Sequence, residues 1–155
     1  MRSSSYRIAI LAVVVVAALI VGSRLAPEKK TAPAADAHAY VDAAVVAICT
    51  DWNREALIDR AAPELAAALQ SSAPREYFVE LSAVGPLKKY EGATGDAKTV
   101  VYNGNAKTTA DYTARAEFER GPATVNISLV KFNEGDWQIA QFQVHPDSPL
   151  PGKTP

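Results

Sequence analysis

The sequence predicts an α+β domain in which N-terminal helices pack on one face of a curved antiparallel sheet, preceded by one apolar N-terminal helix. Apolar residues recur at spacings of three and four between Asp36 and Leu81 and alternate with polar residues after Pro86. A third feature is the uninterrupted apolar run over residues 8–22. Because the helical region precedes the strand region, we expect helices gathered on one face of the sheet.

The first 25 residues hold two arginines followed by that apolar run. As a helix the run would measure about 22 Å, against roughly 30 Å for the hydrocarbon core of a bilayer. It fits either a transmembrane anchor or a signal peptide cut after Ser23. We favour the anchor, because Arg24 would directly follow such a cut. On both interpretations the rest of the chain is extracytoplasmic: membrane-anchored in the periplasm or at the cell surface, or secreted if the signal is cleaved.

Composition divides the remaining chain into a linker, one domain and a tail. Residues 26–35 are rich in Pro, Ala and Lys and read as a linker. Residues 36–145 are long enough for one modest domain. Residues 146–155 carry four prolines, which disfavour both helix and paired strand, so we expect a disordered tail.

Charge content disfavours nucleic-acid binding, and cysteine content excludes an intramolecular disulfide. The formal net charge is −1, and no cluster of Lys and Arg is interleaved with aromatic residues. The chain therefore lacks the electrostatic signature of a nucleic-acid-binding protein. Its single cysteine, Cys49, excludes an intramolecular disulfide and lies at the edge of an apolar helical stripe, where we expect a small buried hydrophobe.

Four helices are expected before Pro86. Asp36 can cap the first, whose apolar stripe consists of Ala37, Val41, Ala44, Val45, Ile48 and Trp52. A second begins after Asn53, and Pro63 and Pro74 open two more. Gly85 and Pro86 end the last.

The second half of the chain has the period of strands. We expect a short strand at 98–102, a hairpin turn at Asn103-Gly104, and three longer strands at 111–119, 124–130 and 137–144. The apolar parity changes at Leu129-Val130 and again between Ile139 and Phe142. Such breaks predict β-bulges, which would curve the sheet and give it a concave face.

Two patterns resemble those of a known superfamily. They are Tyr112-x5-Phe118-x2-Gly121-x-Ala123 and the closing Gly135-x-Trp137-x-Ile139-x2-Phe142-x-Val144. With the helix-then-sheet order, they resemble the cone-shaped, cystatin-like α+β domains of the nuclear transport factor 2-like superfamily over residues 36–144. The resemblance implies a pocket between helices and sheet, in a superfamily with ketosteroid isomerase-like and polyketide cyclase-like enzymes and membrane-anchored periplasmic domains of secretion machinery. It also implies that two copies can pair through their sheets.

No set of residues predicts catalysis, a metal site or a cofactor. Isomerase chemistry needs a carboxylate and a tyrosine in one pocket, but the neighbours Asp111 and Tyr112 would point to opposite faces of a strand. His38 and His145 lie at opposite ends of the domain, and no spacing joins them to Cys49 as base and nucleophile. We also find no paired histidines and no calcium-loop spacing.

Two hypotheses for function follow. We favour a non-catalytic interaction module tethered to a membrane through residues 8–22, as part of an envelope or secretion assembly, which binds an unidentified protein or a second copy. Its docking surface would be the polar strand face, although the same mixture of charged and hydroxyl side chains also fits a face that is merely solvated: Asp111, Thr113, Arg115, Glu117, Glu119, Thr124, Asn126 and Ser128.

The alternative is a binder of a small apolar ligand, and an isomerase-like or cyclase-like enzyme ranks third. The candidate pocket residues are the large aromatics Tyr40, Trp52, Phe78, Tyr112, Phe118, Trp137 and Phe142. A pocket of about 300 Å³ or more would favour the ligand hypothesis over a filled core.

Overall fold

The computed structural model describes residues 33–71 and 74–150. The predicted anchor at 8–22 and the linker up to residue 32 lie outside the described residues, as do residues 151–155. In the described part of the chain, no helix is both long and apolar enough to span a membrane.

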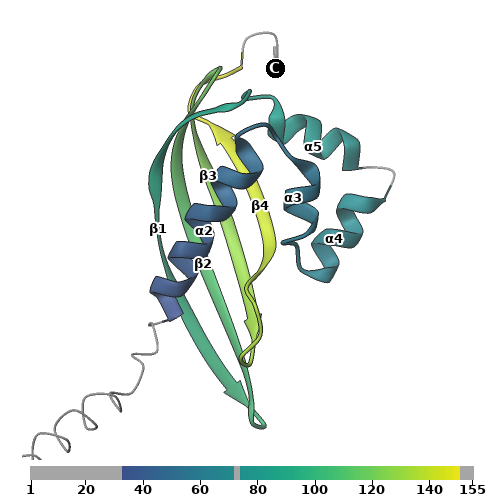
Figure 1. The fold of residues 1–155 in the computed structure, drawn as a ribbon, viewed down its shortest axis with the longest axis vertical. Coiled ribbons are helices and arrows are strands. Elements are labelled where there is room, and N and C mark those ends of the chain that lie inside the picture. Colours follow the sequence, from purple (N-terminus) through teal and green to yellow (C-terminus); the bar gives the residue numbers. More distant parts are fainter. Residues whose placement is uncertain (1–32, 72–73, 151–155) are drawn as a thin grey trace, which may run out of the picture. The chain divides into compact units, whose positions relative to one another are not determined.

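The described chain forms four helices followed by four strands, which confirms the α+β class (Figure 1). The helices are α2 (Pro33–Cys49), α3 (Arg54–Ile58), α4 (Pro63–Gln70) and α5 (Pro74–Ser82). The strands are β1 (Leu87–Tyr102), β2 (Asn105–Phe118), β3 (Gly121–Phe132) and β4 (Gln138–Pro146). They form one antiparallel sheet in the order β1-β2-β3-β4.

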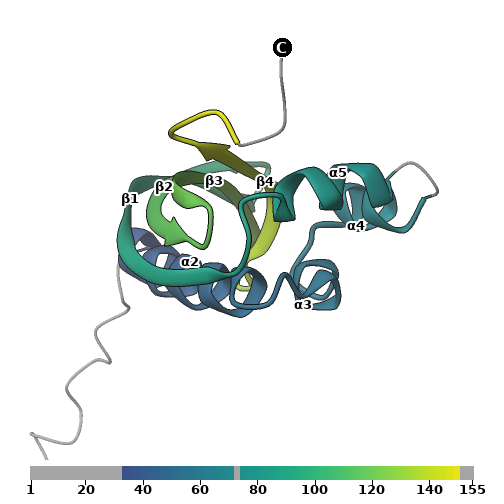
Figure 2. The same ribbon diagram turned by 90° about the horizontal axis from the view of Figure 1, so that it is seen from above.

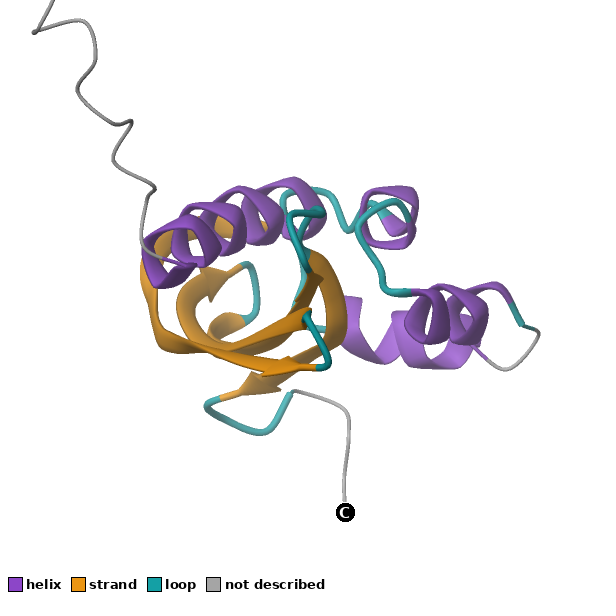
Figure 3. Ribbon diagram, turned by 90° about the horizontal axis from the view of Figure 1, so that it is seen from below, coloured by secondary structure: helices purple, strands orange, loops and turns teal. Residues whose placement is uncertain are grey.

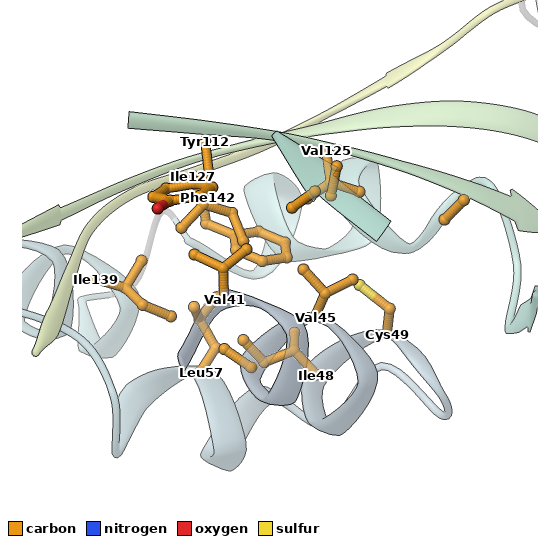
Figure 4. Close-up of a cluster of buried hydrophobic side chains, with 14 of the residues drawn as sticks. Val41, Val45, Ile48, Cys49, Leu57, Tyr112, Val125, Ile127, Ile139 and Phe142 are labelled. Atoms are coloured by element: carbon orange, nitrogen blue, oxygen red, sulfur yellow. The ribbon is translucent and has the colours of Figure 1, made fainter. Parts of the chain in front are cut away.

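The core lies between α2 and the face of the sheet that curves around it (Figure 2). The predicted stripe of α2 is buried from Ala37 to Ile48, and Cys49 is buried beside it. Figure 4 shows this stripe packed against side chains of the central strands and β4, among them Ile127 and Phe142. Burial of apolar surface at this layer is the main stabilising contribution to the fold.

Two details of α2 differ from the prediction. The helix begins at Pro33, so Asp36 lies in its first turn instead of capping it. The Asp36 carboxylate instead accepts a hydrogen bond from Nε1 of Trp137 at 2.8 Å. Trp52 lies beyond the helix end with a φ of 55°, and its Nε1 donates to the carbonyl oxygen of Gly85 at 2.6 Å. The stripe therefore ends at Ile48 and Cys49.

The three short helices begin where the sequence predicts and lie beside β4. Asn53 caps α3, where its side chain accepts from the N–H of Ala56 at 3.0 Å. In the turn before α4, the N–H of Ala62 donates to the Ile139 carbonyl and the N–H of Ile139 donates to that of Arg60, both at 2.7 Å. This turn therefore covers part of the free edge of β4, the kind of edge that natural sheets protect.

Strand β1 is far longer than the predicted segment at 98–102. The part of it before residue 98 contains Gly92, Gly95 and Asp96, which are unfavourable in strands and hide the pattern. The predicted turn is confirmed, because Asn103 and Gly104 have φ values of 50° and 78°.

One predicted bulge is confirmed and the other is wrong. The register between β3 and β4 shifts between Ser128 and Leu129, opposite the parity change in β4. By contrast, the register between β2 and β3 runs through Leu129 and Val130 without a break. The two residues lie on opposite faces of β3, and both faces are covered at this point: Leu129 is buried in the core, and Val130 is buried beside the start of α4.

The predicted tail begins too early. Pro146 is the last residue of β4 and pairs with Ala123. The N–H of Asp147 donates to the carbonyl oxygen of Pro122 at 3.0 Å, and Leu150 packs on the core. Proline at a strand end on a sheet edge forfeits no ladder bond, which is why the proline-based prediction failed here.

Candidate functional site

The sheet face turned away from α2 is polar, and we call it the outer face. In Figure 3, α2 lies on one side of the sheet and no described helix lies across the other. Cross-strand partners share a face, so the register defines its members. Among them are Thr94, Asp96, Lys98, Val100 and Tyr102 of β1, Lys107, Thr109, Asp111, Thr113, Arg115 and Glu117 of β2, Thr124, Asn126, Ser128, Val130 and Phe132 of β3, and Gln141, Gln143 and His145 of β4. The polar strand face predicted from the sequence lies here, except that Glu119 belongs to the turn after β2.

Cross-strand hydrogen bonds order the middle of the outer face. The Ser128 hydroxyl donates to Oδ1 of Asp111 at 2.6 Å, and Nη2 of Arg115 lies 3.0 Å from Oδ2 of Asp147. Between them, Oγ1 of Thr113 donates to Oδ1 of Asn126 at 3.1 Å. Side chains that hold one another lose less conformational freedom when a partner docks on them.

A groove of about 590 Å³ lies at one end of the outer face, and we call it the outer groove. Its lining includes the apolar residues Val130, Phe132 and Ala140 and the charged residues Lys107 and Glu64. Pro63 and Glu64 come from the start of α4, so helix and sheet together form the groove. Protein interfaces likewise combine apolar side chains with charged ones.

A second pocket of about 330 Å³, the side pocket, lies between the start of α2 and the edge strand β1. The rings of His38 and Tyr112 stack in it, with centroids 5.7 Å apart. The Tyr112 hydroxyl donates to the carbonyl oxygen of Ala34 at 2.5 Å and so joins the sheet to the first turn of α2. Burial raises the pKa of Tyr112, and the carboxylates of Asp96 and Asp42 add to the increase.

Next to the side pocket, Asp42 connects two further polar groups. The Tyr90 hydroxyl donates to Oδ1 of Asp42 at 2.6 Å, and Nε2 of His38 lies 3.7 Å from the same oxygen. Burial raises the pKa of Tyr90, and the hydrogen bond to Asp42 raises it further, so the phenol stays protonated. The carboxylate already serves as an acceptor for this phenol. The arrangement therefore has a structural role, because it joins α2 to β1.

Sequence reasoning missed Asp42 and Tyr90. The i,i+4 spacing of His38 and Asp42 was a readable signal, since it places the two side chains on one helix face. Tyr90 had no such signal, because it lies in the unpredicted first half of β1 and 48 positions from Asp42.

The structure distributes the seven predicted pocket aromatics through the core. Phe118 and Phe142 are fully buried, Trp137 is 7% exposed, and Tyr40, Trp52 and Phe78 are partly buried against the same cluster. Trp52 stacks on Phe118 with a centroid distance of 5.8 Å and meets Phe78 edge-on. Of the seven, Tyr112 lines the side pocket, and none lines the outer groove. A shared ligand pocket for them stays a prediction.

The candidate catalytic residues are not brought together. Asp111 is exposed on the outer face and Tyr112 is buried on the opposite one, as the strand alternation predicts. Cys49 is buried, and its burial raises the pKa of its thiol to about 12, far from the range of a nucleophilic thiolate. His145 lies on the outer face near the end of β4, on the other side of the sheet from His38.

Within the described residues, no three or more His, Cys, Asp or Glu side chains gather as metal ligands would. Comparison with known proteins finds no match among family models, curated proteins or solved structures.

Proposed function

We propose that this protein is a non-catalytic interaction module, tethered to a membrane by its first 25 residues, which binds a protein partner on the outer face. The observation that carries the proposal is the outer groove, an apolar hollow in a polar, hydrogen-bonded sheet face.

The partner chemistry follows from the groove. Phe132 lines the groove and is 54% exposed, although removal of a phenyl ring from water is favourable. Lys107 and Glu64, which also line the groove, offer one charge of each sign. The occupant that fits is a protein segment that places an apolar side chain against Val130 and Phe132 and polar side chains against Lys107 and Glu64.

The resemblance to cone-shaped domains supports a second copy of this chain as one such partner, docked sheet to sheet. The small-ligand alternative has weaker support, because most of the predicted pocket aromatics are core residues. The side pocket is the remaining candidate for it, since Tyr112 lines it.

A photo-crosslinking amino acid at two exposed positions of the full-length protein, expressed in cells, tests the proposal. Thr109 lines the outer groove, whereas Ala43 lies on the exposed side of α2. We expect the Thr109 position to capture one defined polypeptide, either another protein or a second copy, and the Ala43 position to capture none. Equal capture from both positions, or none from Thr109, would contradict the proposal.

A matched pair of variants sharpens the test. Thr109→Arg places a bulky charge in the groove, and Gln143→Arg places the same charge elsewhere on the outer face. With the crosslinker at Lys107, capture should fall at least about tenfold in Thr109→Arg, the effect of losing about 1.4 kcal/mol of binding free energy. It should be unchanged in Gln143→Arg.

A further inference from the structure

The tip of the β1–β2 hairpin exposes apolar side chains on both of its faces. Val100 and Val101 are each 66% exposed, and Tyr102 is 75% exposed. We call these three residues the hairpin tip. Val100 and Tyr102 point to the outer face and Val101 to the opposite one, because side chains alternate along a strand. A partner docked on one sheet face would leave part of the tip in water, whereas a medium that surrounds the tip would cover all of it.

The hairpin tip lies at the end of the domain where the N-terminal segment joins it. The Tyr112 hydroxyl bonds Ala34 in the first turn of α2, and Tyr112 pairs with Gly95 of β1. From Gly95 the strand continues to Tyr102, which at about 3.3 Å per residue is roughly 23 Å. Figure 1 shows the hairpin running past the start of α2.

The length of chain between the apolar run and α2 matches this overhang. Residues 23–32 separate the end of the run from Pro33. Fully extended, these ten residues span at most about 33–36 Å. A domain suspended from a bilayer by this chain can therefore bring the hairpin tip to the lipid surface, with about 10 Å to spare.

The chemistry of the tip suits the region between lipid headgroups and acyl chains. Tyrosine places an apolar ring in that region and its hydroxyl in water, and valine is apolar throughout. Lys98 and Lys107, next to the tip on the outer face, have long stems that let the ammonium groups reach the headgroups. Asp96 offsets one of these charges, so apolar insertion outweighs attraction to anionic lipid.

We propose that the hairpin tip inserts into the interface of the membrane to which the chain is tethered, as a second attachment point that sets the orientation of the domain. This inference rests on the tether of the proposed function. It adds a lipid contact that the tether alone does not require.

The test uses the full-length protein in vesicles of phosphatidylcholine and phosphatidylglycerol. Tyr102→Cys and Val101→Cys introduce a thiol on either face of the tip, and Glu117→Cys introduces one on the outer face near the other end of β2. Each is labelled with the polarity-sensitive fluorophore NBD, because buried Cys49 is shielded from the reagent. We expect a shift of emission to shorter wavelength at both tip positions, and its quenching by nitroxide-labelled lipid, with neither at Glu117.

Flotation of the same vesicles separates the two proposals. Protein that fails to float contradicts the tether. Protein that floats while both tip probes report water overturns the tip insertion and leaves the tether standing. A shift at only one tip position, or a shift that nitroxide lipid does not quench, means that a protein covers the tip, and this also overturns the inference.

Discussion

At the residue scale, Gly95 shows how one position fixes the packing of a sheet. A Cβ atom at this position would lie 2.1 Å from the carbonyl oxygen of Asp111 and 2.7 Å from Cγ of Tyr112. Glycine weakens most strands, but here its bare surface lets the Tyr112 ring pack close to the β1 backbone. The same ring then stacks on His38 and bonds Ala34, so β1, β2 and α2 meet at one side chain.

Gly95→Ala should therefore destabilise the domain. We expect a loss of about 1–3 kcal/mol in the free energy of unfolding, because the strand must move to make room for a methyl group. Urea unfolding followed by circular dichroism measures it. Thr94→Ala, at the exposed neighbouring position, should change stability by no more than about 0.5 kcal/mol. Equal midpoints for the two variants would refute this account of Gly95.

Tyr90 should make stability depend on alkaline pH. Its pKa in the folded protein is raised above the ordinary value of 10.0 by burial and by the bond to Asp42. Above about pH 10 the unfolded chain releases the phenolic proton while the folded chain retains it, so stability falls as pH rises. Below that pH the contribution is fully present.

Tyr90→Phe should reduce the slope of this alkaline loss. The free energy of unfolding, measured by urea titration at about pH 9, 10 and 11, gives the slope. Some slope should remain, because burial also raises the pKa of Tyr40, Tyr77 and Tyr112. A variant with the wild-type slope would show that the Tyr90 phenol does not govern the loss.

At the element scale, Asp36 fixes the start of α2 against the sheet. Its carboxylate accepts from Trp137 at 2.8 Å and lies 3.5 Å from Nζ of Lys131, whose ammonium group lies over the Trp137 ring. Asp36→Ala should cost about 1–3 kcal/mol of stability, because it leaves a mostly buried indole N–H without its acceptor. Hydrogen exchange in the first turns of α2 should accelerate. Asp51→Ala, an exposed position in the turn after α2, should leave that exchange unchanged.

The sequence predicted those elements whose signals are local. The stripe of α2 up to Ile48, the start of α3 after Asn53 and the Asn103-Gly104 turn each depend on neighbours within a few positions, and all three are confirmed. The first half of β1 was missed because contacts with β2 stabilise it, and its own composition does not. Tertiary pairing overrode local propensity.

The candidate surfaces also differ in whether the sequence could predict them. Strand alternation was enough to predict the polar outer face, because parity alone decides which side a residue takes. The outer groove was not predictable, since Pro63 and Glu64 reach it only through the pairing of residues 60–62 with Ile139. The bond from Tyr90 to Asp42 joins β1 to α2 and has no local signal.

At the scale of the whole molecule, α3, α4 and α5 share a core with the sheet. Leu57 of α3 and Leu69 of α4 are buried in the same cluster as the α2 stripe. The Tyr77 hydroxyl of α5 donates to the carbonyl oxygen of Phe142, so the helices also engage the free edge of β4. Among the described residues, most of the outer face and the hairpin tip are not covered by these helices.

A shared core predicts that the part of the chain from residue 31 onward unfolds in one cooperative step. Trp52 is hydrogen-bonded to Gly85, just after α5, whereas Trp137 is hydrogen-bonded to Asp36 in the first turn of α2. The single-tryptophan variants Trp137→Phe and Trp52→Phe therefore report on different regions. Each variant should show one midpoint in urea, the same by fluorescence as by circular dichroism, because neither region has a core of its own. If Trp52 fluorescence changes at lower urea than the circular dichroism of the same variant, α3 to α5 unfold separately, and the shared core would not couple them.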